Sequence, residues 1–221
     1  MPTEAKIPLR KRIACEILSW IWVLGAFLLI HGTLVQARVI PTGSMEQMVL
    51  IGDHLLVSRF GYDAELPFTG WHLSLWRNPR RQQVIVFRAP LLGSPDFIKR
   101  VIGIPGDTVE IRDGTVWVNR QPLAEPYLAG TRVPREHFGP VKVPPANYFV
   151  MGDNRGNSYD SRYWGFVPRS AVVGTALMIY MSLEAPGEAW EPGHIQERLS
   201  AYLGALVHPH LVRWQRLFVT F

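Results

Sequence analysis

One long apolar stretch near the start of the chain is followed by short blocks of alternating apolar and polar residues. Residues 17–35 contain no Asp, Glu, Lys or Arg, and only Ser19, His31 and Thr33 interrupt the apolar run. A helix of this length can cross the hydrocarbon core of a bilayer. The pattern therefore predicts one N-terminal transmembrane helix, which we place at residues 15–37.

Charge before this run predicts its orientation. Within residues 1–14, basic residues outnumber acids by four to one: Lys6, Arg10, Lys11 and Arg12 against Glu4. By the positive-inside rule, residues 1–14 form a basic cytoplasmic N-terminus, and everything after Arg38 lies on the opposite side of the membrane.

A cleavable signal peptide is the alternative for this segment, because Val35-Gln36-Ala37 is typical of a small-residue cleavage site. Against it, the apolar run exceeds the roughly 7 to 15 residues of a usual signal-peptide core. Trp20 and Trp22 also suit an anchor near a membrane interface. Either interpretation places the body of the protein outside the cytoplasm.

Beyond the apolar run, short apolar stretches separated by turn residues are typical of β-strands. We expect strands at five stretches: Leu55–Phe60, Val84–Phe87, Phe97–Ile102, Tyr148–Met151 and Ala171–Met181. Within Val109–Val118, alternation on both sides of Asp113-Gly114 predicts a tight hairpin. The pattern therefore predicts a mainly β domain at residues 38–182.

Two parts of the chain depart from this pattern. Residues from about 112 to 146 are rich in proline and charge, and we expect a loop-rich excursion that contributes little to the chemistry. Residues 183–221 form a C-terminal extension, in which Ile195–Leu206 has helical spacing. Arg213–Arg216 is amphipathic enough to lie against a membrane surface.

Composition removes several classes of function. The 18 prolines and 19 glycines are spread over 221 residues, which favours short strands over a helical bundle. The net charge of +5 is dispersed, so no stripe for a nucleic acid appears. The single cysteine, Cys15, excludes an internal disulfide and a CxxC site, and no histidines have metal-ligand spacing. We expect no cofactor, metal or nucleic-acid partner.

Pro41-Thr42-Gly43-Ser44-Met45 follows the apolar run closely and is therefore expected near the membrane surface. Gly43 permits a bend that exposes the Ser44 hydroxyl and aims amide N–H groups at one point, and Thr42 adds a second donor. Gly-Ser turns are also common on protein surfaces, so this motif alone leaves both interpretations open.

The strand expected at Phe97–Ile102 carries two cations among large apolar side chains. Lys99 and Arg100 would lie on opposite faces, and we expect one of them to be partly buried. A desolvated lysine whose pKa falls from about 10.4 to about 7 or 8 becomes a general base. The alternative is a lysine whose amine reaches past its apolar neighbours to water.

Within residues 151–165, eleven residues are almost wholly polar and lie between apolar flanks. It is not an EF-hand loop, because Arg155 and Ser158 stand where Asp or Asn and Gly are needed. A solvated turn and a structured loop that positions a neighbouring lysine both stay open. A Ser-His-Asp triad with His54 or His137 is a further alternative.

In this order, and after an N-terminal apolar run, these elements resemble those of the bacterial type I signal peptidases. The likeness reaches to about Val173 and rests on four motifs: Pro-Thr-Gly-Ser-Met, Gly52-Asp53, Phe-Ile-Lys-Arg-Val-Ile-Gly-Ile-Pro-Gly-Asp, and Gly-Asp-Asn-Arg followed by Asn-Ser-Tyr-Asp-Ser-Arg. The resemblance implies coiled antiparallel sheets and a Ser-Lys serine endopeptidase that removes signal peptides from exported preproteins after an Ala-x-Ala-type site.

The same resemblance implies roles for individual residues. Ser44 corresponds to the nucleophile and Lys99 to its base. Thr42 corresponds to a hydroxyl that helps the Ser44 amide form the oxyanion hole, and Ser158 to a hydroxyl that orients the lysine. The remaining positions are a supporting pair, Asp160 and Arg162, and four residues lining shallow pockets for small side chains, Ile40, Pro41, Met45 and Ile98.

Two departures from the family pattern concern the surroundings of this dyad. Members usually read Ser-Met-x-Pro-Thr-Leu, whereas Gln47-Met48-Val49 follows Glu46 here, and Gly156 stands where an acidic residue is common. We expect activity all the same, in a single-pass monomer of the bacterial inner membrane whose partners are preproteins and lipid. The alternatives are another Ser-Lys self-processing protease and an inactive anchored β-domain that binds exported chains.

Overall fold

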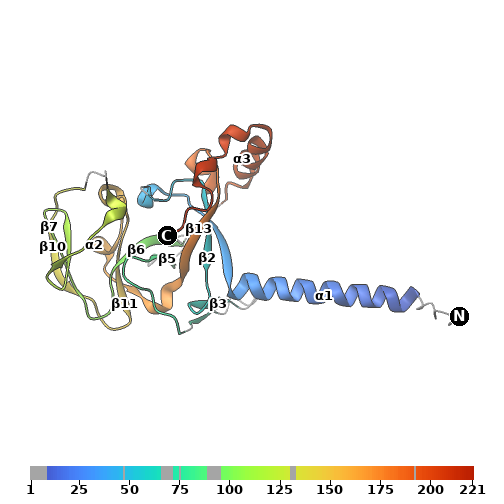
Figure 1. Ribbon diagram of the computed structural model, residues 1–221, viewed down its shortest axis with the longest axis horizontal. Helices are drawn as coiled ribbons and strands as arrows, with labels where there is room; N and C mark the ends of the chain where they lie inside the picture. The colour runs from blue at the N-terminus through green and yellow to red at the C-terminus, as the bar shows by residue number, and fades with distance from the viewer. Residues whose placement is uncertain are drawn as a thin grey trace.

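A long N-terminal helix extends from a β-rich body (Figure 1). The computed structural model describes residues 9–46, 48–65, 72–74, 76–88, 96–129, 133–191 and 193–221. Helix α1 (Leu9–Thr33) leads into strand β1 (Val35–Val39). Residues 35–37, which we placed in the transmembrane segment, are therefore part of the sheet. Among the described residues, no helix is both long enough and apolar enough to cross a membrane.

A seven-stranded antiparallel sheet forms the centre of the body, in the spatial order β1-β2-β13-β5-β6-β11-β12. The strands after β1 are β2 (Asp53–Ser58), β5 (Val84–Phe87), β6 (Phe97–Gly103), β11 (Asn147–Met151), β12 (Val167–Pro168) and β13 (Val172–Ser182). The long β13 pairs with both β2 and β5, and its register shifts several times along the way. Because each shift adds twist, the sheet curls.

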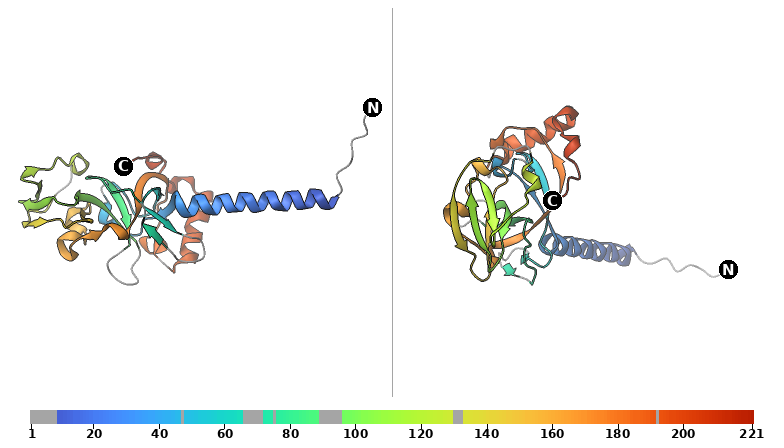
Figure 2. Two further views of the ribbon diagram at one scale, coloured as in Figure 1. Left: turned by 90° about the horizontal axis from the view of Figure 1, so that it is seen from below. Right: turned by 60° about the vertical axis from the view of Figure 1, so that its left-hand side comes forward.

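Two smaller sheets complete the β structure. The four-stranded sheet, in the order β10-β7-β8-β9, consists of β7 (Thr108–Arg112), β8 (Thr115–Val118), β9 (Gln121–Pro122) and β10 (Phe138–Lys142). It lies at the end of the body far from α1 (Figure 2). The two-stranded sheet pairs β3 (Asp63–Glu65) with β4 (His72–Ser74).

Short helices lie between these strands and after them, and one longer helix also follows the last strand. The short ones are η1 (Gly43–Met45), η2 (Pro126–Leu128), η3 (Arg155–Asn157), α2 (Ser161–Trp164), η4 (Arg169–Ala171), η5 (Gly187–Trp190), η6 (Pro209–Leu211) and η7 (Trp214–Arg216). Helix α3 (Ile195–Val207) confirms the helical spacing read from the sequence.

The predicted strands and hairpin are confirmed, and Val84–Phe87 agrees residue for residue with β5. Asp113 and Gly114 both have positive φ, 49° and 81°, as a tight hairpin turn requires. The excursion expected at about 112–146 contains more sheet than predicted, because β9 and β10 lie within it beside the predicted hairpin strand β8. Strand β10 pairs with β7 across a long gap in sequence, which local composition does not reveal.

Among the described residues, the apolar core consists of three clusters, one of which supports the region after β1. That cluster includes Ile40, Met45 and Val49, packed with residues of β2, β5, β6 and β13. Met45 and Val49 have no exposed surface at all. Buried side chains therefore anchor the short segment between β1 and β2 to the core. This anchoring restricts how far the residues of that segment can move.

Candidate active site

Ser44 lies in the single turn of η1, between β1 and β2. Its carbonyl oxygen accepts a hydrogen bond of 3.1 Å from the backbone N–H of Asn154. The Asn154 side chain donates to the carbonyl of Gly43 at 3.0 Å. With Met45 buried in the core, the turn is thus fixed on two sides, and the Ser44 side chain faces a cleft.

Lys99 comes from β6, far from Ser44 in sequence. Its side chain is 4% exposed, and its Nζ lies 2.5 Å from Ser44 Oγ, within hydrogen-bond distance. The structure therefore brings together the two residues that the sequence singled out. An amine that reached past its neighbours to water, the alternative interpretation, is not what the structure shows.

Burial lowers the pKa of Lys99 to about 8, because the charged amine has lost its hydration. The carboxylates of Asp160 and Asp153 oppose this shift, and Arg162 adds to it slightly. The amine consequently changes charge close to physiological pH, as a general base requires.

Arg100, the other cation of β6, is equally buried but has a carboxylate partner. Its guanidinium donates to both oxygens of Asp153, at 2.8 and 2.6 Å, and lies over the ring of Tyr127. We expected one buried cation on this strand, and the structure has two. They differ in that Arg100 is fully paired, whereas the amine of Lys99 contacts a neutral hydroxyl.

Asp160 and Arg162 form a buried ion pair in the polar loop. Asp160 is wholly buried, and its carboxylate accepts hydrogen bonds from the Arg162 guanidinium at 2.8 and 2.9 Å. Arg162 also pairs with Glu136 and donates to the backbone oxygens of Arg155 and Ser158. The loop is therefore structured, and the solvated turn that we kept as an alternative is excluded.

Ser158 is buried, and its hydroxyl has no hydrogen-bond partner among the described residues. Gly152 lies directly against it: a Cβ there would sit 2.3 Å from Ser158 Oγ and 2.4 Å from the carbonyl oxygen of Ser44. Only glycine fits at this position. The Gly152 N–H donates to Asp160 at 3.0 Å, which connects the loop to the back of the Ser44 turn.

A cleft of about 510 Å³ opens beside Ser44 and Lys99. Of the residues predicted to shape substrate pockets, Ile40, Pro41 and Ile98 line it, whereas Met45 lies in the core beneath. Thr42 lines the cleft and is exposed, and its side chain does not cap η1. The other lining residues are Ala37, Arg38, Val39, Val86, Asp96, Phe97, Tyr159, Trp190 and Arg198.

The family model of signal peptidases, peptidase S26, matches residues 13–181. The chain belongs to this family. A probable signal peptidase I-2 of Synechocystis sp. is 40% identical over 157 residues, which are 69% of this chain and 66% of the relative. The signal peptidase I of Leptolyngbya laminosa is 36% identical over 197 residues, 86% of this chain and 88% of that protein.

A solved signal peptidase I from Enterococcus faecalis is 37% identical to this chain, covers 45% of it and 97% of itself, and has a TM-score of 0.40, which is too low to support an argument about the fold. Family membership rests on the sequence matches. The chain is accordingly a serine endopeptidase that removes signal peptides from exported preproteins, and its family is associated with membranes.

Neither histidine considered for a triad contacts the Ser44 of this signal peptidase. His54 is buried, with Nδ1 3.0 Å from the Gly52 carbonyl and Nε2 2.7 Å from the Tyr202 hydroxyl. His137 is largely exposed and lies 3.3 Å from Asp113. The triad is therefore not supported.

Sequence reasoning missed several partners of the site. Glu125 pairs with Arg155, and Glu136 with Arg162, although both acids come from the excursion that we expected to contribute little. The glycine of Gly152-Asp153 was the one available sign that the backbone there lies close to the Ser44 carbonyl. Of the unusual Gln47-Met48-Val49 stretch, Gln47 lies outside the described residues, and Val49 is buried in the core.

Replacing Lys99 with methionine should stabilise the fold at neutral pH. Between pH 8 and 10.5 the unfolded chain binds more protons at Lys99 than the folded chain, so the contribution of Lys99 to stability rises with pH across this window. At pH 7 its burial costs about 3 kcal/mol, offset by about 1 kcal/mol from the hydrogen bond to Ser44. We expect the variant to gain about 2 kcal/mol at pH 7 and almost nothing at pH 10.

Urea unfolding of the full chain in detergent, at both pH values, measures this difference. An equal gain at pH 7 and pH 10, or a loss at pH 7, would contradict the proposal that the amine is held in a desolvated site.

Proposed function

We propose that Ser44 is the nucleophile of signal-peptide cleavage and that neutral Lys99 is its general base. The observation that carries this proposal is the 2.5 Å contact between a buried amine of lowered pKa and a hydroxyl that faces a cleft. Lys99 accepts the hydroxyl proton as Ser44 Oγ bonds to the scissile carbonyl carbon. The protonated amine then donates to the departing amino group, and water hydrolyses the resulting ester.

The oxyanion of the tetrahedral intermediate needs donors beside Ser44 Oγ. Backbone N–H groups in the first turn of a helix have no hydrogen-bond partner within that helix. The N–H of Ser44 is one of these groups in η1. The Thr42 hydroxyl lies on the cleft and is not used to cap the helix. The Ser44 N–H and the Thr42 hydroxyl are our proposed oxyanion hole.

Ser158, Asp160 and Arg162 act through the dyad in this proposal. The hydroxyl of Ser158 is buried and lacks a described partner, so it is available to orient the lysine amine. Asp160 and Arg162 hold the loop that carries Ser158, and they act on the pKa of Lys99 in opposite directions, Asp160 raising it and Arg162 lowering it. Their proposed role is to fix the position of Ser158 beside the amine.

The substrate is proposed to bind as an extended strand. β1 lies at one end of the seven-stranded sheet, and cleft residues follow it from Ala37 to Thr42. An edge strand offers unpaired backbone groups to a peptide. Ile40, Pro41 and Ile98 provide an apolar lining suited to the small side chains of an Ala-x-Ala-type site. Met45 supports this wall from the core.

Ser44→Ala and Lys99→Ala should each reduce cleavage of a preprotein more than about a thousandfold, because either change removes one half of a unit that works together. Cleavage by the purified full chain is followed by gel shift of a radiolabelled preprotein. His137→Ala, at an exposed position, is the matched control and should stay within about twofold of the unchanged enzyme.

This experiment also separates the alternatives. An inactive binding domain would show no cleavage in any variant. A dependence on His137 with Ser44 intact would overturn the assignment of Lys99 as the base. A protease that processes only itself would leave the added preprotein uncut while its own chain is cleaved.

The turnover rate should rise with pH and level off above about pH 8, because only the neutral form of Lys99 accepts a proton. At pH 7 about a tenth of the amines are neutral, so the rate should rise about tenfold per pH unit below the plateau. Single-turnover cleavage between pH 6 and 10 measures this. A midpoint near the ordinary lysine pKa would show that the amine is not desolvated in the working enzyme.

We further propose the topology that the sequence indicates: a cytoplasmic N-terminus, an anchor formed by α1, and a catalytic body on the outer face of the bacterial inner membrane. The described α1 side chains support this, since Trp20, Trp22 and Phe27 are apolar and largely exposed to the surroundings. An anchor would keep the cleft near the apolar segment of a preprotein and so raise the effective concentration of the cleavage site.

The C-terminal extension is proposed to rest on the same membrane. Helix α3 presents one apolar stripe, in which every side chain is more than half exposed: Ile195, Leu199, Leu203, Leu206 and Val207. The helix lies toward the end of the body from which α1 emerges (Figures 1 and 2). An apolar helical face at this level suits the interface of a bilayer.

Leu199→Glu with Leu203→Glu should slow cleavage of preproteins embedded in liposomes by about tenfold and leave cleavage of a soluble signal peptide unchanged, because charges oppose insertion into the interface. Gln196→Glu with Ser200→Glu adds the same charge at exposed polar positions of α3 and serves as the control. Equal rates for both pairs on liposomes would contradict the proposed contact.

A further inference from the structure

The Gly52-Asp53 motif, which the proposed chemistry does not use, is the place where the C-terminal extension meets the catalytic body. Three consecutive residues each contact this extension. The Gly52 carbonyl accepts from the N–H of Leu183 at 3.1 Å, and a Cβ on Gly52 would lie 2.2 Å from the Leu183 oxygen. His54 shares a hydrogen bond with Tyr202. Between them, Asp53 binds Arg216.

Asp53 holds the turn that follows the nucleophile. Its wholly buried carboxylate accepts the N–H of Leu50 at 2.7 Å, and its backbone oxygen accepts the N–H of Ile40 at 3.0 Å. The residue therefore connects the segments on both sides of Ser44. A buried carboxylate is costly without a cation, so this arrangement depends on its partner.

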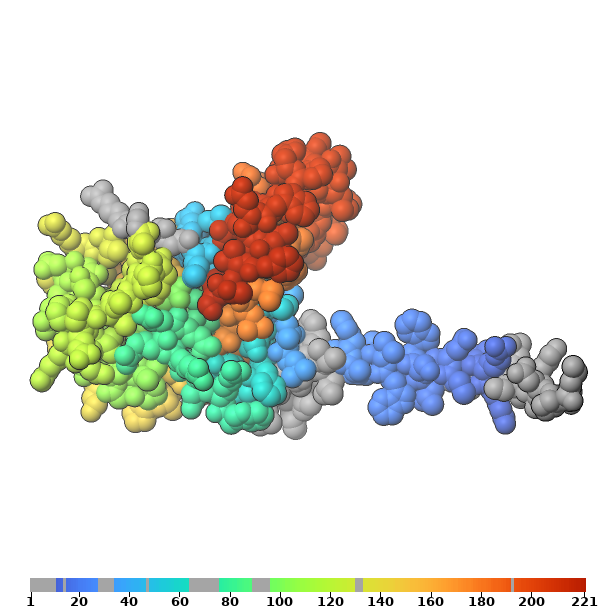
Figure 3. Space-filling model, in the orientation of Figure 1, coloured from blue at the N-terminus to red at the C-terminus, as the bar shows by residue number. Residues whose placement is uncertain are grey.

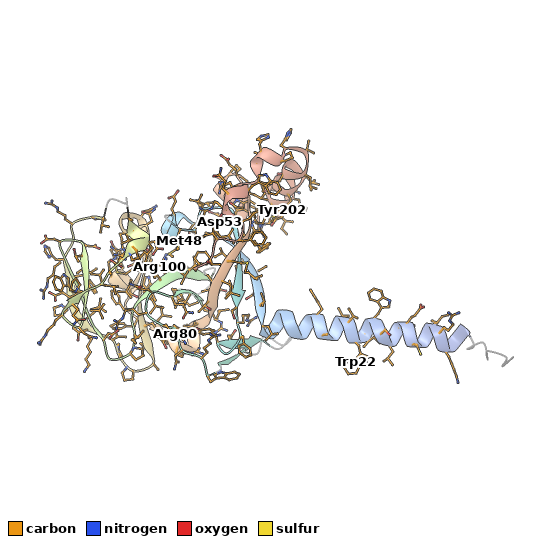
Figure 4. All side chains as sticks on the ribbon, in the orientation of Figure 1. Trp22, Met48, Asp53, Arg80, Arg100 and Tyr202 are labelled. Carbon is orange, nitrogen blue, oxygen red and sulfur yellow. The ribbon has the colours of Figure 1, made fainter. Side chains whose placement is uncertain are left out.

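Arg216 supplies that cation from the last few residues of the chain. Its Nη2 lies 2.6 Å from Asp53 Oδ2, and its Nε lies 3.1 and 3.2 Å from the two carboxylate oxygens. The same Nη2 donates to the carbonyl of Met48 at 2.7 Å. Met48 and Asp53 lie close together where the extension joins the body (Figure 4). Arg216 thus joins the turn that begins at Met45 to the start of β2.

The segment that carries Arg216 is firmly attached. Its backbone bonds to β13 through three hydrogen bonds: Phe218 N–H to Ile179 oxygen at 2.8 Å, Ile179 N–H to Val219 oxygen at 3.0 Å and Arg213 N–H to Ser182 oxygen at 2.9 Å. Val219 and Phe221 pack on the cluster that contains Met45. Figure 3 shows this last segment lying over the strand β13 and beside the residues after β1. The match to the family model ends at residue 181, before this segment begins.

We propose that Arg216 is a positioning residue of the reaction: with Asp53 and the Met48 carbonyl, it fixes the turn behind Ser44 and so keeps Oγ within reach of Lys99 Nζ. This inference rests on the proposed roles of Ser44 and Lys99. Arg216 does not line the cleft, so it acts on the dyad indirectly. It binds the carbonyl of Met48, Met48 bonds to Met45 within the turn, and Met45 directly follows Ser44. Small displacements of reacting groups are costly to rates.

The test compares full-length Arg216→Ala, Arg216→Lys and Gln215→Ala, the last an exposed neighbour. Cleavage of a soluble signal peptide is measured at a temperature where circular dichroism shows each variant folded. We expect kcat of Arg216→Ala to fall about 10- to 100-fold with KM within about twofold, because the dyad loosens while the cleft keeps its lining. Arg216→Lys should retain an intermediate kcat, and Gln215→Ala should be unchanged.

Two further measurements separate positioning from stability alone. Guanidinium ion at millimolar concentration should restore part of kcat in Arg216→Ala and leave the unchanged enzyme unaffected, since it can occupy the vacated place. The double variant Arg216→Met with Asp53→Asn removes both charges, so it should fold even if Arg216→Ala does not, and its kcat should stay low because the Met48 contact is lost.

A kcat close to that of the unchanged enzyme in folded Arg216→Ala, or in the double variant, would overturn the inference. The roles of the dyad are judged apart from this by Ser44→Ala and Lys99→Ala. If these two are inactive while Arg216→Ala is fully active, only the positioning role fails. If either is active, the proposed chemistry itself fails.

Discussion

A buried amine beside a hydroxyl is the constraint on which the rest of this structure depends. Lys99 lacks a carboxylate in direct contact, and the loss of hydration brings its pKa to about 8. Such an arrangement disfavours folding, since the charged amine is better solvated in the unfolded chain. The surroundings must therefore be held by interactions that do not neutralise the amine. Two buried ion pairs, Arg100 with Asp153 and Arg162 with Asp160, hold these surroundings: each acid binds its own arginine and not the amine, and although both acids raise the pKa of Lys99, burial keeps it at about 8.

Ser44, the proposed nucleophile, is held from two directions that are unrelated in sequence. The polar loop bonds to the Ser44 carbonyl through Asn154, and Gly152 allows the two backbones to approach closely. The C-terminal extension reaches the other side through Arg216, which joins Asp53 to Met48. A short helix between two strands has little rigidity of its own. These contacts from the polar loop and the C-terminal extension provide the rigidity that the helix lacks.

The curled sheet makes this arrangement possible. In the order of strands, β1 and β6 are separated by three others, yet residues of both line one cleft. Register shifts along β13 provide the necessary bending. The two walls approach so closely that Arg38 of β1 and Asp96, just before β6, form an ion pair of 2.7 Å across the cleft. An extended peptide in this cleft would thus lie between the edge strand β1 and Lys99, the proposed base.

The sequence by itself predicted five strands of the central sheet, the Asp113-Gly114 hairpin and helix α3, and it singled out Ser44 and Lys99, because periodicity, turn residues and short motifs are local properties. It could not show that Glu125 and Glu136 serve the polar loop, that Met45 lies under the site, or that Arg216 binds Asp53. These contacts join residues far apart in the chain, and partner choice among many dispersed charges is settled only when the curled sheet brings them together. The sequence could not show the desolvation of Lys99 either, since it depends on what surrounds the amine in space.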